Sequence, residues 1–380
     1  MTHTAATTGS GTAGRTKRVL IVNHCGLLLP SATVRAMQYK ELFDRSSAYS
    51  VKYTSRRSEL LVRILHNPER VRWQIFSAMF HRVLDPYSRH WHARREDEIV
   101  ERAADFDIVY VVKSPGGSRF YRRLTEIRGT RTVIDASDAI WLPIFNWDDL
   151  PGTLERVHGV ICESEFVAEY VRQHNANVVV VPDAPQLAHF DRVRSEVRRD
   201  PQRLTIGWIG SSINIGPLYR LIEPLEELFA THRQLHLRIV GAPQSKLPNF
   251  ENVRYSYRAS YSQEEMVREV LNFDIGLLPL FRNMDGKARG TLKAKVYMSG
   301  EAVAVCEDYG QNPDLIQNGI NGVLADSQSD WHDKLEWLIT HPAERTAIAR
   351  NGLNTIRENF TTEQMFAKLV AAFDEIIAKS

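Results

Sequence analysis

Cysteine is scarce in this sequence: Cys25, Cys162 and Cys306 are the three cysteines among 380 residues. None of them belongs to a CxxC pair or has a histidine at ligand spacing, so neither a disulfide framework nor a cysteine-rich zinc site is expected. Each cysteine lies in or beside an apolar run, and we predict buried thiols in a reducing compartment.

Long apolar runs are also missing, since no stretch approaches the roughly 18 residues of a membrane-spanning helix. The polar tail at residues 1–16 lacks the apolar region of a signal peptide, so it is expected to be disordered and the protein cytoplasmic. Within this tail Gly9, Gly11 and Gly14 spell GxGxxG. They precede the first strand instead of following it, so the motif is a compositional accident.

Charge of one sign is not in excess either: 48 basic and 46 acidic side chains give a net charge of +2. This balance, together with the lack of any recognisable nucleic-acid module, argues against nucleic acid as a partner. Locally, residues 52–95 hold ten Lys or Arg against three acidic residues, with aromatic residues between them. Such a span suits peripheral contact with an anionic membrane or an anionic acceptor, or equally a solvated face of amphipathic helices.

The length and an apolar fraction of 43% predict two domains. Short apolar strands alternate with helices along the whole chain, which indicates doubly wound parallel sheets in the α/β class. The charged, proline-containing stretch at 185–202 reads as a linker. The expected units are an N-terminal Rossmann-like domain at 17–184, a second such domain at 203–358, and a final helix at 359–380 that could cross back to the first domain.

Four motifs occur in order in the second half of the chain. They read GWIGSS at 207–212, FDIGLLPL at 273–280, KARGTLKAKVYMSG at 287–300 and NPDLIQNGINGVL at 312–324. Together they resemble the retaining glycosyltransferases of family 4, and residues 159–171 and 178–185 agree more loosely. The resemblance implies a GT-B fold, a nucleotide diphosphate sugar held by the C-terminal domain, an acceptor held by the N-terminal domain, no obligatory metal and retention of anomeric configuration.

Small polar residues follow the first strand of the second domain and precede a helix expected near Pro217. At such a junction backbone N–H groups can point at a phosphate, although a plain turn is the alternative. The candidate donor-binding residues here are Gly210, Ser211, Ser212 and Asn214. In the first domain, Gly26 follows the first strand and could permit close approach of a phosphate to the backbone.

Three cations, Lys287, Arg289 and Lys293, lie between a strand and an apolar helix, so they should gather at the carboxyl ends of the sheet. Fixed cations that meet the charge developing on the β-phosphate lower the barrier to cleavage without a metal. Lys293 matches the family pattern best, and Arg289 shares its predicted catalytic role. The alternative is a solvated basic loop.

Asp285 is expected to contact hydroxyls of the donor sugar, and Asp314 to line the donor site; a turn aspartate and a helix cap are the alternatives. The sequence departs from the family where two glutamates should fall, near Ala288 and Val296. Lys287 and Arg289 are candidates to replace the missing contacts.

In the first domain, Asp135 and Asp138 close a strand and could orient an acceptor hydroxyl or assist its deprotonation. Capping is the alternative for Asp138. Arg35 could face the cleft between the domains or the solvent. In retaining enzymes of this type the leaving phosphate is thought to take the acceptor proton, so a dedicated base is not required.

The sequence therefore predicts transfer of a sugar from a nucleotide diphosphate sugar to a hydroxyl of a glycan, a lipid-linked intermediate or a small molecule, with no cofactor besides that co-substrate. No metal is expected, since His90 and His92 have no further ligands at zinc spacing. Two alternatives stay open: a catalytically silent protein that binds sugar nucleotides, and a nucleotide-sugar epimerase of the same fold.

Overall fold

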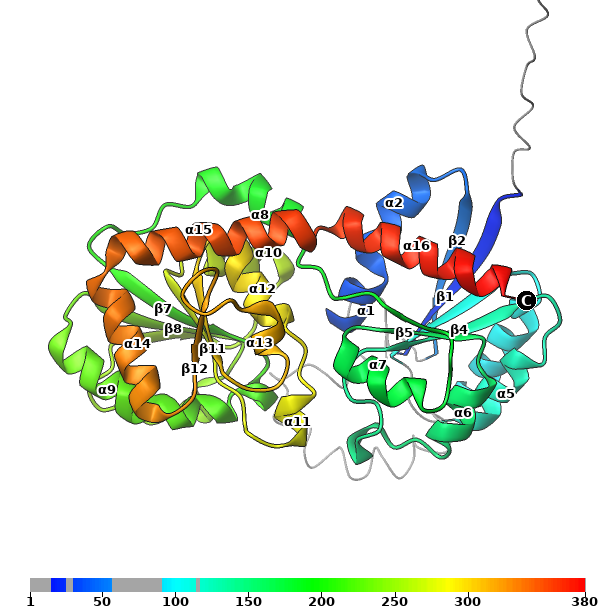
Figure 1. Cartoon of the computed structure of the whole chain (residues 1–380), viewed down its shortest axis with the longest axis horizontal. Coiled ribbons are helices and arrows are strands. Elements are labelled where there is room, and N and C mark those ends of the chain that lie inside the picture. Colours follow the sequence, from blue (N-terminus) through cyan, green and yellow to red (C-terminus); the bar gives the residue numbers. More distant parts are fainter. Residues whose placement is uncertain (1–14, 25–29, 57–90, 114–116, 380) are drawn as a thin grey trace, which may run out of the picture.

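Two parallel β-sheets, side by side, organise the chain (Figure 1). The computed structural model describes residues 15–24, 30–56, 91–113 and 117–379. Cys25, Gly26, the tail at 1–14 and residues 57–90 of the basic span lie outside the described residues. Within the described part, each sheet has six strands in parallel register, which confirms the predicted α/β class and the two Rossmann-like domains.

The first sheet has the strand order β2-β1-β3-β4-β5-β6. Its strands are rich in β-branched residues, and every residue of β3 is buried, as expected for a sheet covered on both faces. Asn23 pairs with both Ser55 and Val112, and Val112 pairs with Asp135, so the strands end at one level. The strands are β1 (Lys17–Asn23), β2 (Tyr49–Ser55), β3 (Ile108–Val112), β4 (Arg131–Ala136), β5 (Gly159–Cys162) and β6 (Val178–Val180).

Helical spacing of apolar residues at 31–43 predicts one helix, but the structure breaks this segment into three pieces. The backbone leaves helical geometry at the buried Ala36, which separates the first helix from a 3-10 turn and the next helix. The described helical segments of this domain are α1 (Pro30–Arg35), η1 (Met37–Tyr39), α2 (Lys40–Arg45), residues 91–103, α5 (Ser118–Thr125), η2 (Pro143–Phe145), α6 (Leu150–Arg156) and α7 (Glu165–Arg172).

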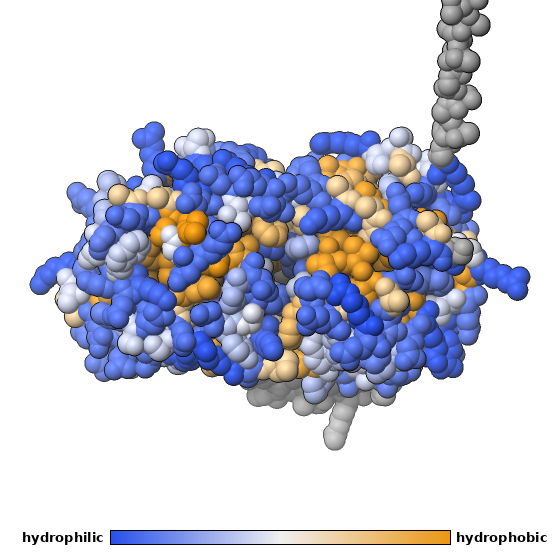
Figure 2. Space-filling model, in the orientation of Figure 1, coloured by the Kyte–Doolittle hydropathy of each residue, from blue (hydrophilic) through white to orange (hydrophobic). Residues whose placement is uncertain are grey.

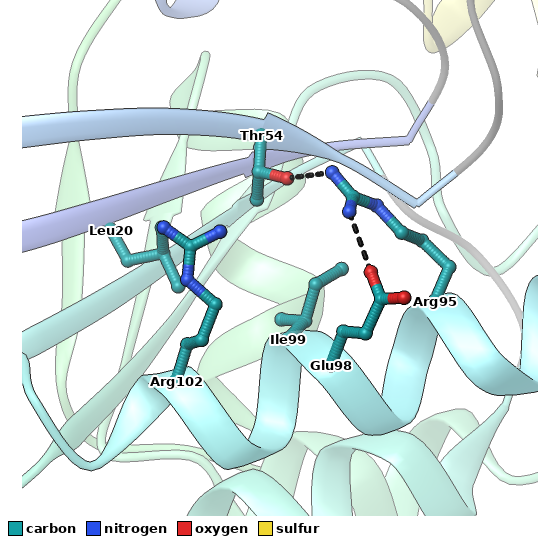
Figure 3. A pocket seen from close by; sticks show the side chains of 6 residues that line it. All are labelled: Leu20, Thr54, Arg95, Glu98, Ile99 and Arg102. Atoms are coloured by element: carbon teal, nitrogen blue, oxygen red, sulfur yellow. Dashed lines mark hydrogen bonds and ion pairs between the residues drawn. The ribbon is translucent and has the colours of Figure 1, made fainter.

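The helix at 91–103 packs beside β1 and β2 (Figure 3). Arg95 donates hydrogen bonds to Thr54 Oγ1 at 2.7 Å and to Glu98 Oε2 at 2.7 Å. Ile99 is buried against the sheet with Leu20. The hollow that remains measures about 10 Å³, enough for about one water molecule.

The second sheet has the order β12-β11-β10-β7-β8-β9. From β7 the chain adds β8 and β9 towards one edge of the sheet and then returns to add β10, β11 and β12 towards the other, so the winding reverses between β7 and β10. In open sheets of this kind, ligands bind outside the carboxyl ends of the strands at the point of reversal. The strands are β7 (Leu204–Ile209), β8 (Leu235–Val240), β9 (Tyr255–Arg258), β10 (Ile275–Leu278), β11 (Val303–Glu307) and β12 (Val323–Ala325).

Helices surround this sheet, and α10 begins with a capping box in which Ser262 and Glu265 each accept a backbone N–H of the other. The helical segments are α8 (Leu187–Val193), η3 (Arg194–Glu196), η4 (Ser212–Asn214), η5 (Gly216–Leu221), α9 (Ile222–Thr231), η6 (Gln244–Lys246), α10 (Gln263–Leu271), α11 (Met284–Lys287), α12 (Leu292–Ser299), α13 (Asn312–Leu315), α14 (Gln328–Thr340) and α15 (Pro342–Asn359).

Residues 185–202, read as a linker in the sequence, contain α8. Leu187, Phe190 and Val193 of this helix are buried in the core of the second domain. Strands β2, β9 and β12 were not foreseen. β9 alternates between exposed and partly buried residues at a sheet edge, so it carries no apolar run that would mark it.

The last helix, α16 (Thr362–Ala378), belongs to the core of the first domain. It continues from α15 across the top of the molecule in Figure 1 and packs Met365, Leu369, Phe373 and Ile376 beside β1 and β3. The chain therefore crosses between the domains twice, once after β6 and once near Phe360.

Polar side chains cover most of the face in Figure 2, with a notch between the two domains.

Lys295 of α12 contacts both crossings. Its side chain is 3% exposed, its Nζ donates to the carbonyl oxygen of Asp183 at 2.9 Å, and the same atom lies 4.1 Å from the ring centroid of Phe360. Burial lowers the pKa of Lys295 to about 8, against the opposing effect of nearby carboxylates. One buried ammonium thus joins the two connections that set the relation between the domains.

Cys162 and Cys306 are buried free thiols, as predicted, and burial raises the pKa of each. In the part of the chain that is described, no helix is both long and apolar enough to cross a membrane.

We expect Phe373→Ala to weaken the first domain. Phe373 is fully buried and its ring lies 5.3 Å from that of Tyr110 in an edge-on arrangement. Its loss should lower the free energy of unfolding by about 3–5 kcal/mol. Urea unfolding followed by circular dichroism measures this, with the exposed Glu375→Ala as the control. Equal effects of the two substitutions would mean that α16 does not contribute to that core.

Candidate functional site

The carboxyl ends of β7 and β8 come close together without side chains between them. A Cβ on Gly241, whose φ is +96°, would lie 1.8 Å from the carbonyl oxygen of Gly210. A Cβ on Gly210 would lie 2.8 Å from Lys293 Nζ and 2.9 Å from the ring of Trp208. Both positions therefore need glycine, and the sheet edge is bare backbone beside one lysine.

Lys293 extends from α12 to this edge. Its Nζ lies over the ring of Trp208, 5.2 Å from the centroid, and the side chain is partly buried. Among the described residues it has neither a hydrogen bond nor an ion pair. Burial, together with the positive charge of Arg289, lowers its pKa to about 8. A cation without a counter-ion is therefore held at the point where the winding of the sheet reverses.

The polar residues after β7 form a 3-10 turn at η4 instead of the start of an α-helix. Asn214 Nδ2 donates to Ser211 Oγ at 3.1 Å, and Ser212 opens the turn. The next segment, which contains Pro217, is also a 3-10 helix, and regular α-helix begins only at Ile222. The structure thus brings Gly210 beside Lys293, whereas the side chains of Ser211 and Asn214 bond each other.

The other predicted cations lie on or beside α11. Arg289 forms an ion pair with Asp285 at 2.9 Å, and both side chains are exposed by more than a third. Lys287 is exposed, and its Nζ lies 5.5 Å from the ring centroid of Phe166 in the first domain. Asp285 therefore neutralises Arg289, and Lys287 faces across the gap between the domains.

Asp314 is an exposed residue of the short helix α13, and its backbone N–H bonds the carbonyl oxygen of Gln311 at 3.3 Å. Ala288 is buried, and Val296 packs partly buried against the core of the second domain. The two positions where the family's glutamates should fall are therefore apolar contacts in this chain.

Arg35 and Asp135 form a buried ion pair at 2.7 Å. Asp135 also accepts hydrogen bonds from Tyr110 and Ser137, and its side chain has no exposed surface. Arg35 extends the network to Asp183 Oδ1 at 2.9 Å. Burial alone would lower the pKa of Arg35, but the carboxylates of Asp135 and Asp183 raise it. These groups fasten β4 to the first crossing and leave no oxygen of Asp135 open to a substrate.

Asp138 has a different position. Its side chain is 35% exposed and pairs with Lys113 Nζ at 2.6 Å. Burial alone would lower the pKa of Lys113, but Asp138 and Glu163 raise it. Both Lys113 (φ +43°) and Asp138 (φ +76°) have left-handed backbones, which non-glycine residues rarely adopt and which concentrate at functional sites.

Glu163 completes this edge of the first sheet, at the end of β5. Its Oε1 accepts the backbone N–H of Asp138 at 3.1 Å and lies 2.9 Å from where a Cβ on Gly290 would stand. Burial, with the carboxylates of Asp183 and Asp138, raises the pKa of Glu163 to about 8. A carboxyl group that keeps its proton near neutral pH therefore faces the loop that leads to Lys293.

The sequence reasoning did not identify Lys113, Glu163, Trp208 or Lys295. The first two follow strands β3 and β5 directly, so the rule that ligands bind at carboxyl ends of parallel strands could have found them. Trp208 and Lys295 carry no such signal. The described residues hold no group of three His, Cys, Asp or Glu side chains arranged to bind a metal ion.

We expect Arg35→Met to lower the free energy of unfolding by about 3–5 kcal/mol, because it leaves the buried carboxylate of Asp135 unpaired. The matched control is Arg45→Met, whose ion pair with Glu41 is largely exposed and is worth about 0–1 kcal/mol. Chemical denaturation measures both. Adding Asp135→Leu should restore part of the loss. A loss no larger than that of the control would contradict a structural role for the pair.

Comparison with known proteins agrees with this geometry. Residues 219–371 match the family model described as Glycosyl transferase-like. Among curated protein sequences, none matches the chain significantly.

Several solved structures share the whole architecture. A glycosyltransferase from Rickettsia africae has a TM-score of 0.66 at 13% identity, over 97% of this chain and 100% of its own. Anabaena Alr3699/HepE in complex with UDP and glucose has a TM-score of 0.65 at 13% identity, over 94% and 100%. Sucrose-phosphate synthase from Thermosynechococcus elongatus has a TM-score of 0.62 at 11% identity, over 96% and 100%. The chain therefore has the GT-B fold of glycosyltransferases, and the region that matches a glycosyl transferase-like family runs from the second domain into α16.

Proposed function

We propose that this chain is a retaining glycosyltransferase that moves a sugar from a nucleotide diphosphate sugar to an acceptor hydroxyl. The observation that carries the proposal is the unpaired Lys293 ammonium beside the bare backbone of Gly210 and Gly241. A cation held at low exposure with no protein counter-ion is costly, and an anionic ligand would remove that cost. The diphosphate is the anionic part of such a donor.

In the proposed reaction the bond between the anomeric carbon and the β-phosphate oxygen breaks, and the acceptor oxygen forms a bond to the same face of that carbon. The proton of the acceptor hydroxyl passes to the departing phosphate oxygen, so no further reactant is needed. Lys293 is positioned to meet the charge that develops on the phosphate. Arg289 is the secondary candidate, because Asp285 already neutralises it.

The acceptor hydroxyl would lie at the facing edge of the first sheet, near Asp138. The ion pair with Lys113 orients the Asp138 carboxylate, whose oxygens can accept a hydrogen bond from a hydroxyl. Glu163, protonated near neutral pH, can donate one. Asp138 therefore takes the role of orienting the acceptor hydroxyl in place of Asp135, because the oxygens of Asp135 are hydrogen-bonded inside the domain.

The uridine nucleotide in the HepE complex makes UDP the first donor nucleotide to test. We infer that the nucleoside lies over Gly241 towards β9, because Tyr261 borders that glycine and is 38% exposed. An aromatic ring with a free surface suits a nucleobase.

A second candidate is a catalytically silent protein that binds nucleotide sugars. The observation that favours it is the apolar pair Ala288 and Val296, where the family's acidic contacts should stand. Release of free sugar or its transfer to acceptor would rule it out, whereas nucleotide binding without turnover over a broad acceptor panel would support it. Conversion of the donor sugar to its epimer without an acceptor would support an epimerase instead.

Lys293→Met should abolish stabilisation of the protein by nucleoside diphosphates while leaving the fold intact. At pH 7 the lysine is charged in both the folded and unfolded states, so the unfavourable burial of its charge is fully present. Removing the charge should therefore keep or raise the melting temperature of the free protein. Thermal shift with UDP, GDP, dTDP, ADP and CDP tests this, since a ligand of the native state raises apparent stability. Lys40→Met, a surface lysine of the first domain, is the control. An unchanged shift with Lys293→Met would refute the assignment.

Binding of the nucleotide should weaken as the pH rises above about 8, which is the pKa of Lys293 in the protein without nucleotide. Below that pH the ammonium is protonated and attracts the diphosphate; above it, a growing share of the protein is neutral at this position. Calorimetric titration between pH 6.5 and about 9.5 should show Kd rising by up to about tenfold per pH unit at the alkaline end. Lys293→Arg stays charged throughout, so its Kd should follow only the titration of the nucleotide. Parallel curves for both proteins would contradict this role.

A further inference from the structure

An open hollow of about 510 Å³ lies beside the first domain's cleft edge, in the segment between β4 and α6. Its size falls within the range of roughly 300–1,000 Å³ that ligand pockets occupy. Of its eleven lining residues, three are aromatic, two are carboxylates and one is an amide, and the other five are aliphatic: Ile140, Leu142, Pro143, Leu150 and Pro151. Those used below are Trp141, Trp147, Tyr170, Asn146, Asp148 and Asp149.

The aromatic groups form a row that leads from the hollow to the gap between the domains. The rings of Tyr170 and Trp141 stack at 4.3 Å with an interplanar angle of 25°, and Phe166 follows at 5.7 Å from Trp141. Phe166 is the residue over which Lys287 of the second domain lies. The row of rings therefore extends from the hollow to the gap between the two domains.

The polar groups of the hollow are fixed in place by the backbone. Asp149 caps α6 with its Oδ1, which accepts the N–H of Gly152 at 2.9 Å, and its Oδ2 has only a distant contact with Arg156 at 3.6 Å. Asp148 is held by the N–H and hydroxyl groups of Ser118. Each Asp148 oxygen already accepts two hydrogen bonds, from Ser118 and, at Oδ1, also from the backbone N–H of Asp149. The free acceptor of this wall is therefore Oδ2 of Asp149.

Asn146 adds an amide. It is exposed, has a left-handed backbone with φ +47° at the end of η2, and no described side chain bonds its amide. It can therefore both donate to and accept from a ligand in the hollow.

We propose that this hollow binds a neutral oligosaccharide, the part of the acceptor that lies away from the reacting hydroxyl. The inference rests on the proposed function and specifies its acceptor. A sugar ring presents C–H faces that pack on aromatic rings and hydroxyl groups that hydrogen-bond to carboxylates and amides, which are the groups gathered here. The two aspartates oppose an anionic chain, and their presence in the wall is unsuited to a lipid tail.

The test is direct glycan binding, without the donor. Wild-type protein is applied to a printed glycan array that includes neutral and acidic oligosaccharides, and the best neutral ligand is titrated in solution by tryptophan fluorescence. We expect binding of neutral chains and a tenfold or greater loss of affinity in Trp141→Ala. Asn146→Gly, which tolerates the left-handed backbone, should weaken binding without unfolding the segment. The control is Trp337→Ala, whose ring is 40% exposed and stacks on His341 in the second domain.

Binding to no glycan on the array, binding only to acidic chains, or equal affinity of Trp141→Ala and Trp337→Ala would overturn the proposal. Nucleotide binding by the same variants, measured by thermal shift, should be unchanged. If neutral glycans bind through Trp141 but no nucleotide stabilises the protein, the hollow is a glycan-binding site and the glycosyltransferase proposal fails. Nucleotide binding and transfer to an acceptor in Trp141→Ala at the wild-type KM would refute the hollow alone.

Discussion

The arrangement of the site depends on one constraint: a positive charge at Lys293 that the protein itself does not neutralise. Of the neighbouring cations, Arg289 forms an ion pair with Asp285. Lys287 lies over the ring of Phe166, as Lys293 lies over that of Trp208. Two glycines remove the side chains that would otherwise fill the space in front of the ammonium. Charge and room are thus provided together at the point where the winding of the second sheet reverses, which is where such folds bind their ligands.

The first domain contributes through the way the two domains are held together. Lys295 contacts both crossings of the chain, and the network of Arg35, Asp135 and Asp183 fastens the first crossing to β4. These buried contacts set which residues face each other across the gap, namely Glu163 opposite Gly290. Domain closure, if it follows donor binding as in many enzymes that exclude water, would turn about these two crossings.

The fold could be predicted largely from the sequence because alternation of apolar strands and helices is a strong, local signal. The edge strand β9 and the helix α8 were missed, since the first lacks an apolar run and the second lies in a charged, proline-containing stretch. The position of Lys293 at the carboxyl ends of the second sheet followed from its motif. The roles of charged residues depend on partners distant in the chain: Asp135 and Asp138 look alike in sequence, yet only contacts to Arg35 and Lys113 separate a buried structural carboxylate from an exposed one.

The two halves of the candidate site also differ in how their chemistry is set. On the donor side, burial lowers the pKa of Lys293, so the group is ready to gain from an anion. On the proposed acceptor side, burial and neighbouring carboxylates raise the pKa of Glu163, so this carboxyl group keeps its proton near neutral pH. Groups whose pKa values are shifted in opposite directions are typical of acid–base and anion-binding sites.

The most direct test of the central claim is hydrogen–deuterium exchange with and without saturating nucleoside diphosphate. Binding of the diphosphate at Lys293 predicts slower exchange in residues 210–216, 241–246 and 288–294, with no change in the remote helix α15. Protection confined to other segments, or none with a nucleotide that demonstrably binds, would contradict a donor site at the carboxyl ends of β7 and β8.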